Sequence, residues 1–347
     1  PKSWIRTANY LLSPLPYIEP NAACLKDMFM CRPRRCRATS SNNNHFLRRP
    51  NNIGAKLNTS FDIESCAEHL GAEIVGIDLS QDIDDSVFND IDQAFAEYGV
   101  VFFRNQNITP EHQVDFSKRF GALECFPLTQ YSVEGFPEVL QVTNIQKDGV
   151  NIGLADAGVT WHSDMSWTAV PPRGSALYAV ELPVKDGKIL GGTLFASATA
   201  AYDALPDDMK ARIAGLTAIH SYVGKHAHRT KQGEYNREAM TEEQQSKYPE
   251  VFHPIVRTHP MTGRKGLYVV KGECTGIVDM PDADAMPLLD ELAEHTIRPE
   301  FQYSHDWQIG DFLMWDNCSL QHLAVRNYDL PLRRMMHRTQ FAGSVTF

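Results

Sequence analysis

Hydrophobic positions along the chain recur with two different periods, which divide it into short strands and amphipathic helices. Between residues 85 and 98 they follow the 3.6-residue period of a helix, with Val87, Ile91 and Phe95 on one face. Residues 70–79 alternate as a strand does, and residues 99–104 form a continuous apolar run typical of a buried strand. The same criteria predict helices at 197–205, 207–215 and 286–295, and strands at 175–181, 194–196, 254–257, 266–270 and 311–315.

A helix from Pro110 to Phe120 is predicted from its end signals. Thr109 is a candidate N-cap, and Pro110 at the first helical position already has the backbone angle that a helix needs. Gly121 follows the last helical residue, as glycine does at many helix C-termini.

The strands after Val159 are short and separated by turns, a pattern typical of a jelly roll. We therefore expect a mainly β fold with flanking helices around a double-stranded β-helix (jelly roll) core. Residues 225–250 interrupt this pattern with Lys, Gln, Glu and Tyr, which predicts a long loop or a partly helical insertion. Long loops inside a compact domain often cover active sites.

The first 57 residues differ in composition from the rest of the chain. They contain ten Lys or Arg and two acidic residues, Glu19 and Asp27, among many Pro, Asn and Ser. Residues 1–57 are interpreted as a disordered leader without function, a targeting segment of the organellar transit type, or a basic arm for nucleic acid. Because no linker or internal repeat follows, residues 58–347 are predicted to form one domain.

Composition and charge exclude several classes of protein. Residues 58–347 carry 23 basic and 41 acidic side chains, so their average field does not attract nucleic acid. No apolar run approaches the length that spans a membrane. The seven cysteines show no regular spacing, which favours a reducing interior. We expect a cytoplasmic protein, unless the leader directs import into an organelle.

The stretch Trp161-His162-Ser163-Asp164 carries the first candidate chemistry. Its aromatic and β-branched surroundings predict the end of a strand, on which His162 and Asp164 share one face. An imidazole and a carboxylate side by side supply two of the three ligands of a facial Fe(II) site, which leaves positions open for substrate and oxygen. The triplet alone is a weak signal, so a third ligand has to come from elsewhere.

A second group of candidate residues lies near the C-terminus. His322 follows Trp315-Asp316-Asn317 and is the candidate third ligand. Arg334 and Arg338 are candidate anion clamps, because a guanidinium binds a carboxylate or sulfonate through two parallel hydrogen bonds. If residues 334–338 form a strand, positions i and i+4 share a face, and both guanidiniums point into one cavity.

These motifs together resemble those of the taurine dioxygenase and 2,4-dichlorophenoxyacetate dioxygenase family. The resemblance runs from about Leu70 to Gly343, and such ordered coverage is far more specific than one triplet. It includes, in order, Gly99–Arg104, Arg119-Phe120-Gly121, Trp161–Asp164, Gly191-Gly192-Thr193, His253–Pro260, Trp315–Asn317 with His322, and Arg334–Arg338.

The resemblance implies an Fe(II)- and 2-oxoglutarate-dependent dioxygenase that consumes O2 and forms succinate and CO2. It makes His162, Asp164 and His322 the metal ligands and catalytic residues. It also implies that Thr193 and Arg334 hold the far carboxylate of 2-oxoglutarate. A buried arginine without a partner is costly, which gives Arg334 a physical reason to bind that carboxylate.

The resemblance also bears on the primary substrate, which it implies is a small organic acid: an aryloxyalkanoate-like carboxylate, a sulfonate or an alkyl sulfate. Arg338 matches the position that meets the anionic group in taurine dioxygenases. Their sulfonate-binding histidine and tyrosine align with Phe126 and Thr129, and an asparagine before the first iron ligand aligns with Gly158. We therefore expect a carboxylate rather than taurine, with Phe126 as an apolar wall of the pocket.

Glu273 is a further difference, because it aligns with an aromatic residue that packs on taurine in that family. Its carboxylate could pair with a cationic part of the substrate, pair with Arg338 or point to solvent. If Glu273 faces the pocket unpaired, a zwitterion becomes the better prediction, since a bare carboxylate repels an anion.

The remaining histidines are given structural interpretations. His226 and His228 are read as surface residues of a polar loop rather than as a metal pair, and His253 and His259 as structural.

Two other functions stay open on the residues alone. A non-catalytic jelly roll could bind a 2-oxo acid or a metal, and a zinc hydrolase shares the ligand types but gives no role to Thr193 and the paired arginines. We expect a small-molecule anionic or zwitterionic substrate and no nucleic-acid or membrane partner, and leave homo-oligomer formation open.

Overall fold

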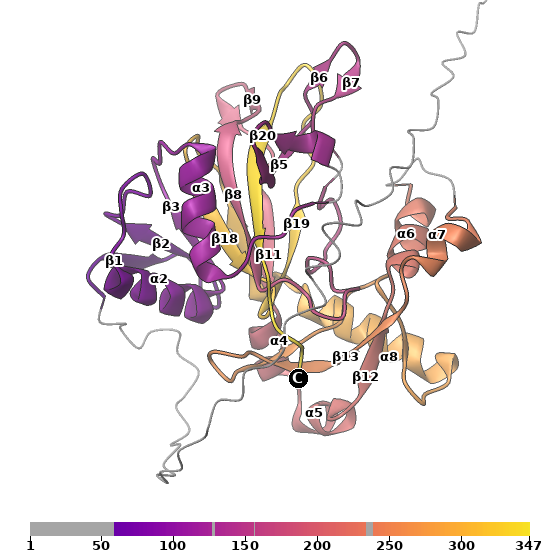
Figure 1. Ribbon diagram of the computed structural model, residues 1–347. Coiled ribbons are helices and arrows are strands. Elements are labelled where there is room, and N and C mark those ends of the chain that lie inside the picture. Colours follow the sequence, from indigo (N-terminus) through magenta and orange to yellow (C-terminus); the bar gives the residue numbers. More distant parts are fainter. Residues whose placement is uncertain (1–58, 127–128, 156, 234–238) are drawn as a thin grey trace, which may run out of the picture. The chain divides into compact units, whose positions relative to one another are not determined.

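A computed structural model describes residues 59–347 except 127–128, 156 and 234–238. In this part of the chain strands predominate and helices flank them (Figure 1). The predicted leader, residues 1–57, lies outside the described residues. None of the helices in the described ranges is long and apolar enough to cross a bilayer.

The largest sheet of the described residues has the strand order β1-β2-β3-β18-β8-β20-β5-β4. Its paired strands are antiparallel except β2 and β3, which are parallel. The bounds are Asp62–Ser65 for β1, Ala72–Val75 for β2, Val100–Phe103 for β3, Phe312–Asp316 for β18, Gly174–Glu181 for β8, Met335–Phe341 for β20, Phe136–Thr143 for β5 and Ser132–Val133 for β4.

A smaller antiparallel sheet has the order β17-β11-β19, with bounds Gln302–His305, Thr193–Ser197 and Leu320–Ala324. Alternate residues of the large sheet pack against two different partners, as the two-residue period of a strand requires. Val100 and Phe102 of β3 share a buried cluster with Phe195 of β11 and Leu320 of β19. The two sheets therefore face each other across a common core.

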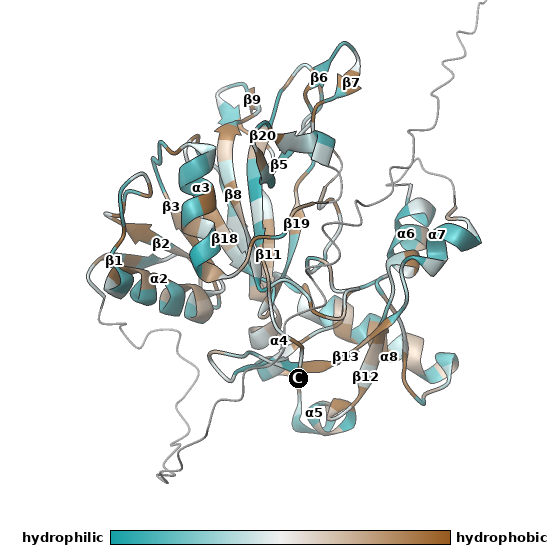
Figure 2. Ribbon diagram, in the orientation of Figure 1, coloured by the Kyte–Doolittle hydropathy of each residue, from teal (hydrophilic) through white to brown (hydrophobic). Residues whose placement is uncertain are grey.

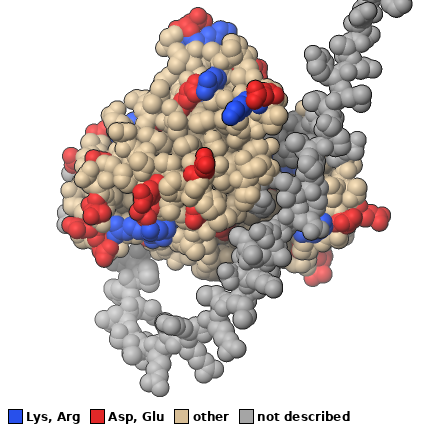
Figure 3. Space-filling model, turned by 45° about the horizontal axis from the view of Figure 1, so that its top comes forward, with Lys and Arg blue, Asp and Glu red and all other residues tan. Residues whose placement is uncertain are grey.

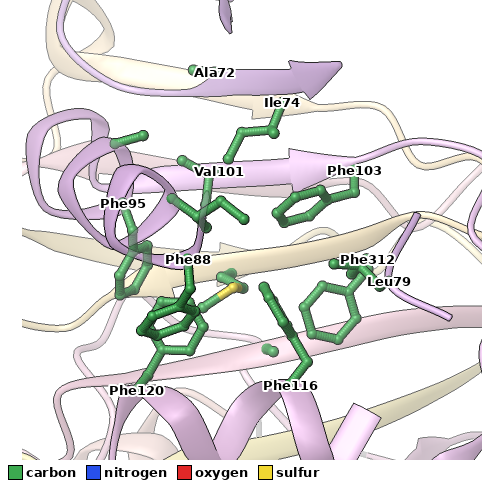
Figure 4. Close-up of a cluster of buried hydrophobic side chains, with 14 of the residues drawn as sticks. Ala72, Ile74, Leu79, Phe88, Phe95, Val101, Phe103, Phe116, Phe120 and Phe312 are labelled. Carbon is green, nitrogen blue, oxygen red and sulfur yellow. The ribbon is translucent and has the colours of Figure 1, made fainter. Parts of the chain in front are cut away.

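The opposite face of the large sheet is covered by helices. Val101 and Phe103 pack with aromatic side chains of α2 (Asp85–Tyr98) and α3 (Pro110–Ser117), among them Phe95 and Phe116 (Figure 4). The rings meet edge to face, which is a favourable arrangement for aromatic pairs. Figure 2 shows the matching hydropathy, with brown, hydrophobic colouring on β2 and β3 and teal, hydrophilic residues on α2 and α3.

A third buried cluster joins helices α4 (Ala198–Ala204), α5 (Asp207–Ile213) and α8 (Asp282–Thr296) to short strands. These strands are β12 (Thr217–His220), β13 (Val251–Pro254), β14 (Val256–Thr258), β15 (Lys265–Leu267) and β16 (Cys274–Ile277). The polar insertion between β12 and β13 contains α6 (Tyr222–Lys231) and α7 (Glu242–Ser246), so the partly helical alternative is confirmed. Acidic and basic side chains are interspersed on the face shown in Figure 3.

Short elements complete the described part of the chain: the two-stranded ribbons β6 (Gln146–Lys147) with β7 (Val150–Asn151) and β9 (Val184–Lys185) with β10 (Lys188–Ile189), and the 3-10 helices at 118–120, 129–131 and 299–301.

Several predicted bounds are corrected by local backbone geometry. The strand predicted at 70–79 is reduced to Ala72–Val75, because Gly71 and Gly76 both adopt positive φ angles and end the extended backbone. The helix predicted from Pro110 to Phe120 is capped by the Thr109 side chain, as expected, but changes to a 3-10 turn after Ser117. α8 begins at Asp282, before the predicted start at 286.

Replacing Phe95 with alanine tests the aromatic core. Phe95 is fully buried, with ring centroids 5.7 Å from Phe120 and 5.9 Å from Phe341, so Phe95→Ala should lower the free energy of unfolding by about 3–5 kcal/mol. The control is Phe252→Ala, which removes a side chain that is 60% exposed and should change stability by about 0.5 kcal/mol or less. Denaturant unfolding measures both, and equal losses in the two variants would contradict the assigned core.

Candidate active site

His162 and His322 are brought together by backbone pairing. The His162 N–H donates to the His322 carbonyl at 3.1 Å, and the His322 N–H donates to the His162 carbonyl at 2.9 Å. The two residues therefore lie directly opposite each other, with ring centroids 4.1 Å apart. The strand end predicted at His162 is only this single bridge, because Met165 takes a left-handed φ of 47° and the chain turns after Asp164.

The ligand atoms of the three predicted residues converge. Asp164 Oδ1 lies 3.6 Å from His162 Nε2 and 3.8 Å from His322 Nε2, and all three side chains are buried. His162 Nδ1 is 2.8 Å from the Thr160 carbonyl, so this nitrogen carries the proton and the lone pair of Nε2 is directed at the group. Two imidazole nitrogens and one carboxylate oxygen fit the donor set of a facial Fe(II) site.

The second oxygen of Asp164 is held by the large sheet. Asp164 Oδ2 accepts hydrogen bonds from Ser175 Oγ at 2.8 Å and Trp315 Nε1 at 3.1 Å, and pairs with an Arg338 guanidinium nitrogen at 3.0 Å. These donors belong to β8, β18 and β20, which are neighbours in the sheet. Asn317 also accepts a hydrogen bond from the Asp164 backbone N–H, at 3.3 Å. With Oδ2 engaged in this way, Oδ1 is the oxygen that faces the histidines.

The charges around the site set the protonation states that a metal needs. Burial acts to raise the pKa of Asp164, but Arg338 and the two histidines outweigh it and hold that pKa well below its ordinary value. Burial, reinforced by His162, keeps the pKa of His322 well below its ordinary value. The site therefore presents an ionised carboxylate and a neutral imidazole.

Arg334 fits the role expected for a cosubstrate clamp. It is 5% exposed, its Nε has no hydrogen-bond partner, and no carboxylate of the described residues forms an ion pair with it. Its guanidinium carbon lies 5.9 Å from the ring centroid of Trp307, whose indole N–H donates to Thr193 Oγ1 at 3.0 Å. One tryptophan thus links the two residues predicted to hold 2-oxoglutarate.

Arg334 borders a small pocket. It lines this pocket together with Val142, Thr143, Asn144, Leu154, Ala155, Ala157, Val159, Gly191, Ala324, Val325, Arg326 and Tyr328. Gly191 has a φ of 75°, and a Cβ there would stand 2.8 Å from Tyr328 and 3.1 Å from Arg334 Nε, so glycine is required. A buried cation beside a pocket fits the far carboxylate of a dicarboxylic acid.

The predicted common face of the two arginines is supported by the packing of β20. Met336, between them in sequence, belongs to the core between the two sheets, whereas Phe341 packs with the helices on the opposite face. Arg338 lies 5.9 Å from the Trp315 ring, in the same inter-sheet core. Arg334 and Arg338 therefore both enter the space between the sheets.

The structure excludes two of the three alternatives for Glu273, which were exposure to solvent and pairing with Arg338. Glu273 is 2% exposed, so it does not point to solvent, and its ion-pair partner is Lys225 rather than Arg338. Lys225 Nζ lies 2.6 Å from Glu273 Oε1, and Ser166 Oγ donates to Glu273 Oε2. Sequence reasoning missed Lys225, because it belongs to no recognisable motif and its partner Glu273 lies far from it along the chain. Phe126 is half-buried beside two residues that are not described, and no described contact assigns its role.

The other histidines are largely structural, with one correction. His226 is 8% exposed, so its predicted surface position is wrong, because the amphipathic α6 buries His226 together with Arg229. His259 Nε2 lies 2.9 Å from Asp316 Oδ2, and its Nδ1 accepts from two backbone N–H groups. Both nitrogens of His259 are thus used, although His259, Asp316 and Cys318 are also close enough to surround an ion.

Comparisons with known proteins agree with this geometry. Residues 62–340 match the family described as taurine catabolism dioxygenase TauD, TfdA family. The chain is 33% identical over 292 residues to a (S)-phenoxypropionate/alpha-ketoglutarate-dioxygenase of Sphingobium herbicidovorans, covering 83% of this chain and 96% of that protein. It is 33% identical over 280 residues to an alpha-ketoglutarate-dependent 2,4-dichlorophenoxyacetate dioxygenase of Cupriavidus pinatubonensis, covering 78% and 93%.

Solved structures give the same assignment. The crystal structure of AAD-2 in complex with Mn(II) and N-oxalylglycine has a TM-score of 0.68 and 31% identity, covering 82% of this chain and 98% of that one. A putative alpha-ketoglutarate-dependent taurine dioxygenase from Burkholderia xenovorans has the same score and identity, covering 83% and 94%. The chain belongs to the TauD/TfdA family. It is an Fe(II)- and 2-oxoglutarate-dependent dioxygenase, and neither the non-catalytic protein nor the zinc hydrolase is supported.

Removing any of the three residues predicted to bind the metal should abolish Fe(II)-dependent turnover. His162→Ala, Asp164→Ala and His322→Ala each remove one donor of the triad, so each should also weaken binding of Mn(II), used as an oxygen-stable substitute, by at least about tenfold. Calorimetric titration measures the metal, and succinate release measures turnover. The control is His112→Ala on α3, outside the site. Full activity in one of the three variants would remove that residue from the triad.

Arg334→Ala should raise the KM for 2-oxoglutarate by about ten- to hundredfold, the scale of a lost charge-assisted contact worth about 1.5–3 kcal/mol. The affinity for Fe(II) should change much less, because the contact described for Arg334 is with Trp307 rather than with His162, Asp164 or His322. The neighbouring Arg333 is the matched control, since its side chain is 53% exposed and pairs with Glu181. An equal effect of Arg333→Ala would show that the wrong arginine has been assigned.

Proposed function

We propose that His162, Asp164 and His322 hold Fe(II), that Thr193 and Arg334 hold the far carboxylate of 2-oxoglutarate, and that the enzyme hydroxylates a small organic acid. The observation that carries this proposal is a buried triad together with a buried arginine, Arg334, whose Nε has no hydrogen-bond partner and which forms no ion pair with a carboxylate of the described residues. Because the large and the small sheet face each other across a common core, we assign them to a double-stranded β-helix.

When bound, iron and 2-oxoglutarate supply the oxidation, in which decarboxylation to succinate and CO2 is coupled to hydroxylation of a substrate C–H bond. The protein binds and orients the reactants. Trp315 and Ser175 fix the carboxylate of Asp164, and Trp307 fixes the hydroxyl of Thr193. Such positioning is a main contribution of protein groups to cofactor chemistry.

A carboxylate is the proposed anionic group of the substrate. Relatives are named for phenoxypropionate, 2,4-dichlorophenoxyacetate and sulfate esters, all of which are anionic. Arg338 Nε has no hydrogen-bond partner, so this guanidinium retains a donor beyond those that hold Asp164. Glu273 is paired with Lys225, so the unpaired carboxylate that would favour a zwitterion is not present. Phe126 stays the proposed apolar wall.

The proposed setting is a reducing one. The four cysteines of the described residues, Cys66, Cys125, Cys274 and Cys318, form no disulfide bond with one another, and Fe(II) is retained more readily where oxidants are scarce.

The substrate class is tested by succinate release across taurine, alkyl sulfates, aryloxyalkanoates and amino acids. Aryloxyalkanoates should give the largest release, and Arg338→Ala should raise their KM about tenfold or more. The same variant should also lower kcat, because Asp164 loses a cationic partner.

Ser175→Ala is the matched control for that experiment. It removes another donor to Asp164 Oδ2 and one acceptor of Arg338 but no positive charge, so it should lower kcat and raise the KM for the acid much less than Arg338→Ala does. Taurine as the best substrate would overturn the carboxylate assignment. An unchanged KM in Arg338→Ala would remove Arg338 from the substrate site.

A further inference from the structure

The ion pair between Lys225 and Glu273 connects the polar insertion to the metal site. Lys225 lies in α6, and its ammonium nitrogen is 2.6 Å from Glu273 Oε1. The other oxygen of Glu273 accepts a hydrogen bond from Ser166, which follows the ligand Asp164 by two residues. His220 Nδ1 is 3.1 Å from the same serine hydroxyl. Glu273 is thus held by the hydroxyl of Ser166 at one oxygen, and its other oxygen fixes the position of the Lys225 ammonium.

Lys225 retains hydrogen-bonding capacity that Glu273 does not use. An ammonium group has three N–H donors, and among the described contacts Lys225 has Glu273 as its one ion-pair partner. Its side chain is 14% exposed, whereas the Glu273 side chain is 3% exposed, so the ammonium is the more accessible end of the pair. Arg338, by contrast, is already paired with Asp164 and hydrogen-bonded to Ser175 and Gln340.

We propose that Lys225 binds the anionic group of the primary substrate and so selects acids over neutral molecules, with Glu273 as the positioning residue that holds its ammonium in place. This inference rests on the proposed function, in which the substrate is a small organic acid. It adds a second cation to Arg338 and assigns to the insertion, residues 222–231, a direct part in substrate recognition.

The alternative role for Lys225 is to neutralise a buried carboxylate. A buried glutamate without a partner is strongly destabilising, so Lys225→Met alone would confuse substrate binding with damage to the fold. The double variant Lys225→Met/Glu273→Gln removes both charges and keeps similar side-chain volumes, which separates the two roles. Lys231→Met is the control, because Lys231 is exposed on the same helix.

Succinate release is measured against the concentration of phenoxyacetate, 2-phenoxypropionate and their neutral amides, with each variant confirmed as folded by circular dichroism. In the double variant the KM for the acids should rise about ten- to hundredfold, while the KM for 2-oxoglutarate stays within about twofold. The preference for acid over amide should fall by the same factor. Lys231→Met should behave as the unsubstituted enzyme does.

Each outcome decides between the two proposals. Acid-stimulated turnover with an unchanged acid KM in the double variant would show that Lys225 only neutralises Glu273, and would overturn this inference alone. If the unsubstituted enzyme releases no more succinate with any of the acids than without them, and none of the wider panel stimulates it, the proposed function fails and the inference fails with it. Glu273→Gln alone frees Lys225 from its partner, so it should preserve some acid preference.

Discussion

The active site depends on how the carboxylate of Asp164 is divided between two neighbours. Oδ2 is held by Ser175, Trp315 and Arg338, which project from three adjacent strands of the large sheet. Oδ1 is left to face the two histidines, whose positions come from the small sheet through the bridge between His162 and His322. The proposed metal site therefore lies where one sheet fixes the carboxylate and the other fixes the imidazoles.

The positively charged side chains near the site differ in the partners that they already have. Arg334 has no carboxylate partner in the described part of the chain and is available to a ligand. Arg338 is mainly committed to Asp164, and Lys225 is held by Glu273. Since a buried charge is tolerated only when it is paired or hydrogen-bonded, each cation can be assigned from the partner it already has.

The sequence predicts which residues converge at the proposed site better than it predicts their contacts. The triad, Thr193 and the two arginines are recognisable because they lie in motifs with fixed spacing, and the helix at 85–98 because its hydrophobic period is long and regular. The pairing of His162 with His322, and of Lys225 with Glu273, joins residues far apart in the chain. Such register is fixed by packing of the whole domain, which no local pattern encodes.

Local geometry limited the prediction in other places. The extended segment at His162 ends at once because Met165 adopts a left-handed conformation, and the strand at 72–75 is confined by two glycines with positive φ. His226 lies in a polar segment and is predicted to be exposed, but it is on the buried face of α6. In these cases the backbone conformation or the packing of the element, rather than the type of side chain, determines the observed structure.

The central claim is that Asp164 binds the metal through one oxygen while the large sheet retains the other. A crystal structure of the anaerobic complex with Fe(II) and 2-oxoglutarate tests this most directly. The account predicts bonds from His162 Nε2, His322 Nε2 and Asp164 Oδ1, with Asp164 Oδ2 still hydrogen-bonded to Ser175 and Trp315. Coordination through both oxygens of Asp164, or a site that lacks either histidine, would contradict it.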